Sequence, residues 1–143
     1  MKTIHFNQIN VEDMVFDYDQ TLVDNGIIMP LLKRLVELQV KKINIWSNGN
    51  TWIKDGILES LGIEAVHVDV PGPMEVGIEK YLADFEICQE EGAKIGMAHN
   101  VSAPKYTNLL PKGKILVDDL APLWNRIGGN TITPEEALKY LNK

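Results

Sequence analysis

The stretch FDYDQTLVDNG, from Phe16 to Gly26, places two aspartates one residue apart at the end of an apolar run. That run, Met14-Val15-Phe16, has the short apolar pattern of a buried strand. Side chains two residues apart on an extended chain point to the same side, so Asp17 and Asp19 direct their carboxylates the same way. The end of this strand is therefore the first candidate for a functional site.

Strand and helix patterns alternate along the rest of the chain. We predict strands over 14–16, 43–46, 65–70, 114–117 and 130–133, helices over 30–40, 52–61, 74–91 and 120–128, and a short helix over 105–110. A final helix follows the capping-box sequence Thr133-Pro-Glu-Glu136, which places a proline in the first turn. Strands separated by helices predict a mainly parallel five-stranded sheet covered on both faces, a Rossmann-like three-layer α/β sandwich in a single domain over 1–143.

Composition and charge exclude several classes of protein. The 143 residues are 45% hydrophobic and 24% charged, the proportions of an ordinary globular domain. A net charge of -6 argues against binding nucleic acid mainly through its phosphate backbone. The start of the sequence lacks the apolar core of a secretory signal, and no apolar run approaches the roughly 20 residues that cross a bilayer. We therefore expect a cytoplasmic protein with no membrane partner, in which the one cysteine, Cys88, is a buried thiol.

Three of the predicted strands end in polar side chains. Asp17 and Asp19 follow the first strand, Ser47 follows the second, and Asp118 and Asp119 follow the fourth. The carboxyl ends of parallel strands meet at one edge of the sheet, so these side chains should converge there. Two carboxylates about 4 Å apart repel each other by roughly 1 kcal/mol in water and by about 4 kcal/mol at an effective dielectric of 20. The cluster therefore needs a cation, and oxygen ligands without histidine or cysteine favour Mg²⁺.

These motifs together resemble the haloacid dehalogenase-like (HAD) phosphohydrolase superfamily. Its first motif, Asp-x-Asp-x-Thr after an apolar strand, is matched by Asp17-Tyr-Asp19-Gln-Thr21. Its second strand ends in Ser or Thr, matched by Ser47, and its fourth ends in paired acids, matched by Asp118 and Asp119. The resemblance covers essentially the whole chain, and the acid at position 19 is typical of the phosphate-ester hydrolases of the superfamily.

The resemblance implies a role for each matched residue. Asp17 would be the nucleophile that forms an aspartyl-phosphate, and Asp19 would be the general acid and base. Mg²⁺ would be held by Asp17, the backbone carbonyl of Asp19 and Asp118, while Asp119 orients the water shell and Thr21 supports the loop. Ser47 and Asn48, with a lysine, would hold the transferring phosphoryl oxygens.

Four lysines are candidates for that phosphate-binding role: Lys94, Lys105, Lys112 and Lys114. Lys112 and Lys114 precede or open the fourth strand, at the far end of the sheet from the site. Lys94 follows a predicted helix end and is less well placed. We predict Lys105, because its spacing to the paired acids is that of compact nucleotidase-like members of the family.

The sequence leaves little room for the cap domain that family members usually carry. One helix uses nearly all of the stretch between Asp19 and Ser47, and 71–104 offers only a minimal lid. In the family, such an uncapped site resembles those that admit bulky substrates or macromolecular ends, or that use a neighbouring subunit as the lid. The leading hypothesis is a phosphatase acting on a phosphomonoester, with a nucleotide or a similar metabolite favoured. Alternatives are a nucleic-acid 3′ end, a phosphoprotein, or a non-catalytic binding module that keeps the fold.

Several other residues have a structural and a functional interpretation. Trp46 and Trp124 are expected in the core, whereas Trp52 follows the Ser47 loop and is a candidate for lining the pocket. His99 and Asn100 precede Lys105 and either contact substrate or form an exposed polar loop, which is the favoured interpretation.

Overall fold

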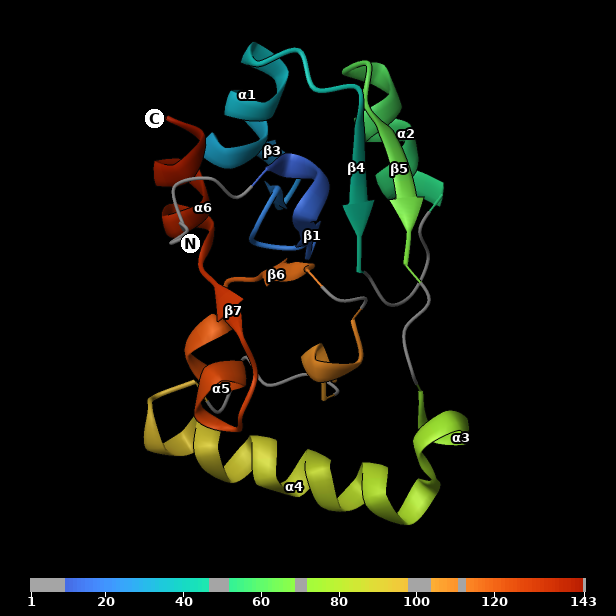
Figure 1. The fold of residues 1–143 in the computed structure, drawn as a ribbon, viewed down its shortest axis with the longest axis vertical. Helices are drawn as coiled ribbons and strands as arrows, with labels where there is room; N and C mark the ends of the chain where they lie inside the picture. Colours follow the sequence, from blue (N-terminus) through green and yellow to red (C-terminus); the bar gives the residue numbers. More distant parts are fainter. Residues whose placement is uncertain (1–9, 47–51, 69–71, 98–103, 111–112, 143) are drawn as a thin grey trace.

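The computed structural model describes residues 10–46, 52–68, 72–97, 104–110 and 113–142, except for the side chains of 52–54 (Figure 1). Its centre is a five-stranded sheet with strand order β5-β4-β1-β6-β7. The strands are β1 (Met14–Phe16), β4 (Lys42–Ile45), β5 (Glu64–His67), β6 (Ile115–Val117) and β7 (Thr131–Ile132). Every neighbouring pair in this sheet is parallel, which confirms the predicted parallel sheet.

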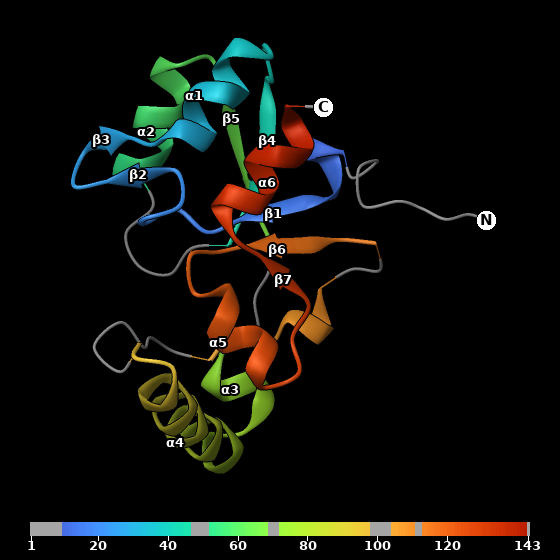
Figure 2. The same cartoon turned by 90° about the vertical axis from the view of Figure 1, so that its left-hand side faces the viewer.

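Helices cover both faces of the sheet, as Figures 1 and 2 show. One face packs against α1 (Pro30–Glu37), α2 (Trp52–Ser60) and α6 (Pro134–Leu141), and the other against α5 (Ala121–Arg126) and α4 (Ile78–Lys94). The alternation of side chains along β1 divides the core, because Met14 and Phe16 join the first cluster and Val15 joins the second. The three layers are therefore those of a Rossmann-like α/β sandwich.

The strand order reverses at β1. The chain leaves β1 for β4 and β5 on one side, then crosses to β6 and β7 on the other. Open sheets of this kind bind their ligands beyond the carboxyl ends of the strands at such a reversal point. Asp17 and Asp118 are the residues directly after β1 and β6, so both aspartates stand at that point.

A hairpin between β1 and α1 was missing from our prediction. It pairs β2 (Val23–Asp24) with β3 (Ile27–Ile28) in antiparallel register. Asn25 and Gly26 form its two-residue turn, with φ of 50° and 81°. Asn-Gly at a turn that needs two positive φ angles is a strong hairpin signal, which the shortness of the flanking strands obscured.

The predicted helix over 74–91 was wrong in both its continuity and its end. The structure has two helices, α3 (Pro73–Val76) and α4, separated by Gly77 at φ 95°. A positive φ interrupts a right-handed helix, and glycine adopts it without steric cost. Gly92, expected to stop the helix, is buried within α4, which continues to Lys94.

The predicted short helix over 105–110 was also wrong. Only a single 3₁₀ turn forms there, η4 (Thr107–Leu109), and Leu110 is extended with ψ 151°. The residue before a proline disfavours helical backbone, and Pro111 follows in the sequence. Likewise, the helix predicted over 30–40 ends at Glu37, because Gln39 has φ 58°.

The final helix starts at its predicted position, and β1, β4, β6 and β7 lie within one residue of their predicted bounds. The strand predicted over 65–70 is shorter, because β5 ends at His67 and 69–70 lie outside the described residues, and the helix predicted over 120–128 ends at Arg126. Thr133 caps α6 by accepting a hydrogen bond from the Glu136 N–H at 3.1 Å, as the capping box predicts. Among the described helices, none is both long enough and apolar enough to cross a bilayer.

Candidate active site

The sheet ladder fixes the backbone of the two central aspartates. The N–H of Asp17 donates to the Val117 carbonyl at 2.9 Å, and the N–H of Asp118 donates to the Ile132 carbonyl at 3.0 Å. These bonds extend strand pairing by one residue past the end of β1 and of β6. Backbone hydrogen bonds of a sheet are among the least mobile contacts in a domain, so both carboxylates start from fixed positions.

A tight turn after Asp17 brings Thr21 back to the same place. The Tyr18 carbonyl accepts from the N–H of Leu22 at 2.9 Å, and Gln20 takes φ 62°. The buried Thr21 hydroxyl donates to Asp17 Oδ2 at 3.4 Å and accepts from the Asp119 N–H at 3.2 Å. Thr21 therefore joins the loop after β1 to the loop after β6.

Three carboxylates converge at this edge of the sheet. Asp17, Asp118 and Asp119 each offer an oxygen, and these oxygens lie within 4.8 Å of one another. Asp118 is buried, and Asp17 and Asp119 are half-buried. A group of oxygen ligands at this spacing suits a hard divalent cation such as Mg²⁺.

Lys105 lies between two of these carboxylates. Its Nζ is 2.9 Å from Asp17 Oδ1 and 2.7 Å from Asp118 Oδ2, and its side chain is 6% exposed. The structure thus brings the predicted lysine together with Asp17 and Asp118.

The competing lysines lie elsewhere. Lys94 pairs with Glu91 on the exposed side of α4, and Lys114 donates to the Glu12 carbonyl at 2.7 Å, near the start of β6. Lys112 is outside the described residues. Of the four candidates, Lys105 is therefore the one that the described structure places among the acids.

One lysine faces three carboxylates, and burial shifts the pKa values of this cluster. Burial, with the charge of Asp118, raises the pKa of Asp17 from 3.8 to about 6, although Lys105 opposes the rise. Burial and a hydrogen bond with Asp118 raise the pKa of Asp119 from 3.8 to about 8. Despite its burial, Lys105 has a raised pKa, because Asp118 and Asp17 stabilise its charge. The cluster therefore retains protons that a metal ion would replace.

Besides Lys105 and Asp119, Asp118 has two N–H donors as hydrogen-bond partners. The N–H of Leu120 donates to its Oδ1 at 2.9 Å, and the indole Nε1 of Trp124 donates to its Oδ2 at 3.1 Å. Sequence analysis assigned Trp124 to the core, where its ring does lie fully buried. Its contact with Asp118 was missed, because spacing along α5 gives no indication of where an indole N–H points. Trp46 is also buried, and its ring lies 5.9 Å from the Lys105 Nζ.

The other predicted site residues divide into two groups. Asp19 is exposed, and its carboxylate is outside the group of three, although its charge contributes to the raised pKa of Asp17. The predicted phosphate ligands Ser47 and Asn48, and the loop residues His99 and Asn100, lie outside the described residues, as does the side chain of Trp52. Their roles stay predictions.

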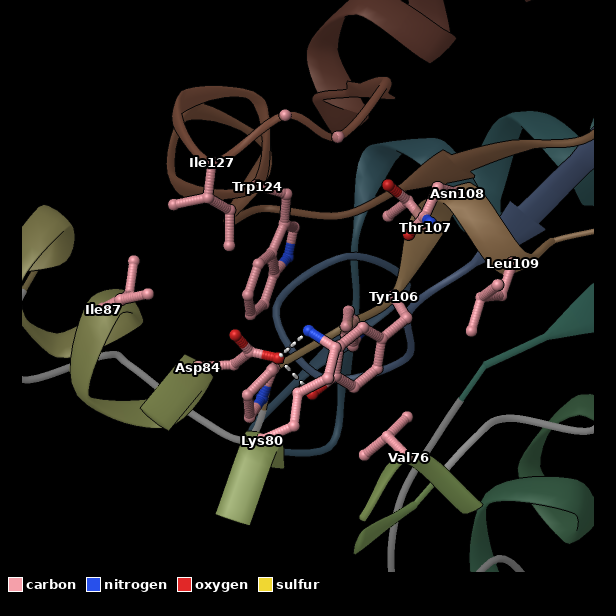
Figure 3. A pocket seen from close by; sticks show the side chains of 14 residues that line it. Val76, Lys80, Asp84, Ile87, Tyr106, Thr107, Asn108, Leu109, Trp124 and Ile127 are labelled. Atoms are coloured by element: carbon pink, nitrogen blue, oxygen red, sulfur yellow. Dashed lines mark hydrogen bonds and ion pairs between the residues drawn. The ribbon is translucent and has the colours of Figure 1, made fainter. Parts of the chain in front are cut away.

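Lys105 and Trp124 also belong to the wall of a pocket of about 510 Å³ between α4, the 104–109 segment and the end of α5 (Figure 3). In this pocket Asp84 Oδ2 accepts from Lys80 Nζ and from the Tyr106 hydroxyl, each at 2.8 Å. The hydrogen bond from Lys80 holds the pKa of Asp84 below its usual value. Apolar side chains, among them Ile87 and Ile127, complete the wall (Figure 3).

Comparisons with known proteins give no relative from which to infer an activity. No protein-family model, curated protein or solved structure matches the chain. Function is therefore inferred from the residues of this site.

Proposed function

We propose that the protein is a Mg²⁺-dependent phosphatase of the HAD-like type that hydrolyses a phosphomonoester through an aspartyl-phosphate. The observation that carries this proposal is the contact of Lys105 with both Asp17 and Asp118 at the carboxyl ends of β1 and β6. It joins three separate motifs of the sequence in one group.

The residues present fit a magnesium ion. Asp17 and Asp118 would hold it with the backbone carbonyl of Asp19, and Asp119 would act in or beside its shell. The fit rests on three carboxylates that each offer an oxygen, with these oxygens within 4.8 Å of one another, and that face a single lysine. When bound, the ion would neutralise charge between a dianionic phosphate and the carboxylates.

The proposed reaction has two displacements at phosphorus. In the first, a carboxylate oxygen of Asp17 attacks, the bond from phosphorus to the ester oxygen breaks, and Asp19 donates its proton to the leaving oxygen. In the second, Asp19 takes a proton from water, which attacks phosphorus and breaks its bond to Asp17. Inorganic phosphate leaves, and both aspartates return to their starting states.

The surroundings of each residue suit its proposed role. Asp17, with a pKa of about 6, is mainly ionised at neutral pH, as a nucleophile must be. Asp19 is exposed and two residues away, where it can exchange protons with solvent and with a leaving group. Lys105 carries a fixed positive charge beside Asp17, where phosphoryl oxygens gain negative charge in the transition state.

The segments between the site motifs are too short to hold a large cap domain over the site. Between β1 and β4 the chain forms only the β2–β3 hairpin and α1, so no cap domain is inserted there. The described part of the proposed lid over 71–104 consists of α3 and α4, and α4 packs beside α5 through the buried Cys88. We favour a nucleotide or a similar phosphorylated metabolite, with nucleic-acid 3′ ends and phosphoproteins as alternatives.

Phosphate release from an aryl phosphate tests the reaction. The wild type should turn over with Mg²⁺ and stop with a chelator, and Asp17→Asn should be inactive. Asp24→Asn is the matched control, because Asp24 is an exposed acid of β2 in the same loop region. A panel of nucleotides, sugar phosphates, phosphopeptides and 3′-phosphorylated oligonucleotides then identifies the substrate class. Folded protein that binds Mg²⁺ but releases no phosphate from any panel member would favour a binding module.

A further inference from the structure

The carboxylate of Asp118 is held by three donors from three parts of the chain. Its Oδ1 accepts from the N–H of Leu120 at 2.9 Å. Its Oδ2 accepts both from Lys105 Nζ at 2.7 Å and from the Trp124 indole at 3.1 Å. The side chain of Asp118 is 1% exposed, so protein groups rather than bulk water surround these oxygens.

Trp124 brings its donor to Asp118 from α5, the helix that follows β6. The ring is fully buried in the cluster formed by Val15, Leu116 and the apolar side chains of α5. An indole N–H can only donate, and an unpaired buried donor costs roughly 1–3 kcal/mol. Packing of the ring therefore fixes the direction of the N–H, and the N–H fixes one oxygen of Asp118.

The number of acceptor positions on the Asp118 carboxylate indicates what the hydrogen bond from Trp124 does. Each carboxylate oxygen has about two lone-pair positions. Lys105 and Trp124 fill those of Oδ2, whereas Leu120 fills one of those of Oδ1. Apart from the hydrogen bond that Asp118 shares with Asp119 in the metal-free protein, the acceptor position that these three donors leave is therefore on Oδ1.

We propose that Trp124 is a positioning residue. Its hydrogen bond holds Oδ2 of Asp118 toward Lys105, so that Oδ1 would be the oxygen available to a metal ion. The proposal rests on the phosphatase function proposed above and adds to it a residue that its motifs do not contain. Loss of the indole N–H opens an acceptor position on Oδ2 and lets the carboxylate turn. Removing an outer hydrogen bond that orients a metal ligand commonly weakens metal binding about 10- to 100-fold.

Metal titration of purified protein tests this role. Trp124→Phe keeps an aromatic ring in the core but removes the N–H. Trp46→Phe is the matched control, since Trp46 is buried in the same cluster and its ring faces Lys105 instead of donating to Asp118. By calorimetry we expect Trp124→Phe to bind Mg²⁺ at least about 10-fold more weakly than the wild type. Trp46→Phe should stay within about 3-fold, and equal affinity in the wild type and Trp124→Phe would overturn the proposal.

A second measurement on metal-free protein covers the case in which Trp124→Phe does not fold. In ¹⁵N-labelled wild type, the Trp124 indole N–H resonance should exchange slowly with solvent. Asp118→Asn should shift this resonance more than Asp24→Asn, whereas equal shifts would overturn the contact. If the wild type bound no Mg²⁺, the proposed function would fail, and the indole resonance alone would still decide whether Trp124 holds Asp118.

Discussion

Replacing the proposed nucleophile should stabilise the metal-free protein. In the folded state, burial and the neighbouring acids make the charged form of Asp17 unfavourable, and its pKa is about 6 instead of 3.8. Asparagine has a similar shape and carries no charge. Asp17→Asn therefore removes an unfavourable charge, although it also removes one partner of Lys105.

The magnitude follows from the pKa. One pKa unit corresponds to about 1.4 kcal/mol, so a rise from 3.8 to about 6 corresponds to about 3 kcal/mol of lost folding stability. Because the folded pKa is raised, this loss is complete above about pH 6 and disappears below pH 3.8, where the carboxyl is protonated in both states. Asp17→Asn should thus be more stable than the wild type by up to about 3 kcal/mol at pH 8 and by much less at pH 4.5.

Urea unfolding with a chelator present measures this difference. The free energy of unfolding should be determined for the wild type and Asp17→Asn at both pH values, with Asp24→Asn as a control that changes an exposed acid. Mg²⁺ should reverse the ranking at pH 8, because it stabilises only the protein that retains the ligand. A variant equally or less stable than the wild type at pH 8 would refute the reasoning, as would a gain independent of pH.

Three further predictions concern Lys105, the pH dependence of Mg²⁺ binding, and the stability of α2 and α6. Lys105→Met should destabilise the metal-free protein by roughly 3–5 kcal/mol at pH 8 and by less at pH 5, where Asp17 is protonated. As a control in the same urea assay, Lys114→Met should cost under about 1 kcal/mol. Mg²⁺ binding should release protons, and its affinity should increase between pH 6 and pH 8, because Asp119 has a pKa of about 8. Equal heats of Mg²⁺ binding in buffers of different ionisation enthalpy would contradict this proton release. Gly56→Ala should stabilise α2 by roughly 0.5–1 kcal/mol, since nothing lies within 4 Å of the added methyl, and Thr133→Ala should cost about 1 kcal/mol because α6 loses its cap. Thermal unfolding that ranked the two variants in the opposite order would refute both assignments.

Hydrophobic periodicity, and the residues that start or stop helices and strands, predicted the fold well where the signal is local. Short apolar runs such as Ile115–Val117 and the capping box at Thr133 contain their own signals, so the parallel sheet and α6 could be predicted. Errors occurred where one backbone angle outweighed the pattern. Gly77 divides a helix whose apolar spacing continues across it, and Gln39 ends α1 in a conformation that glutamine rarely adopts.

The candidate site was predictable to the extent that it depends on strand ends. Asp17 and Asp118 follow strands that lie side by side, so the motif order alone brings them together. Lys105 required an argument from spacing, because it lies on an irregular segment. The Trp124 contact could not be predicted, since it depends on how a buried ring is oriented by packing between α5 and the sheet.

Trapping the phosphorylated protein tests whether phosphate is transferred covalently to Asp17. Wild type with Mg²⁺ and the preferred phosphomonoester should be quenched in acid within the first turnover and mapped by peptide mass spectrometry. The account predicts one phosphoryl group on the peptide that contains Asp17, absent from Asp17→Asn and absent when the metal is chelated. Phosphate release without phosphorylation of that peptide, or a folded, metal-bound protein that releases none, would contradict it.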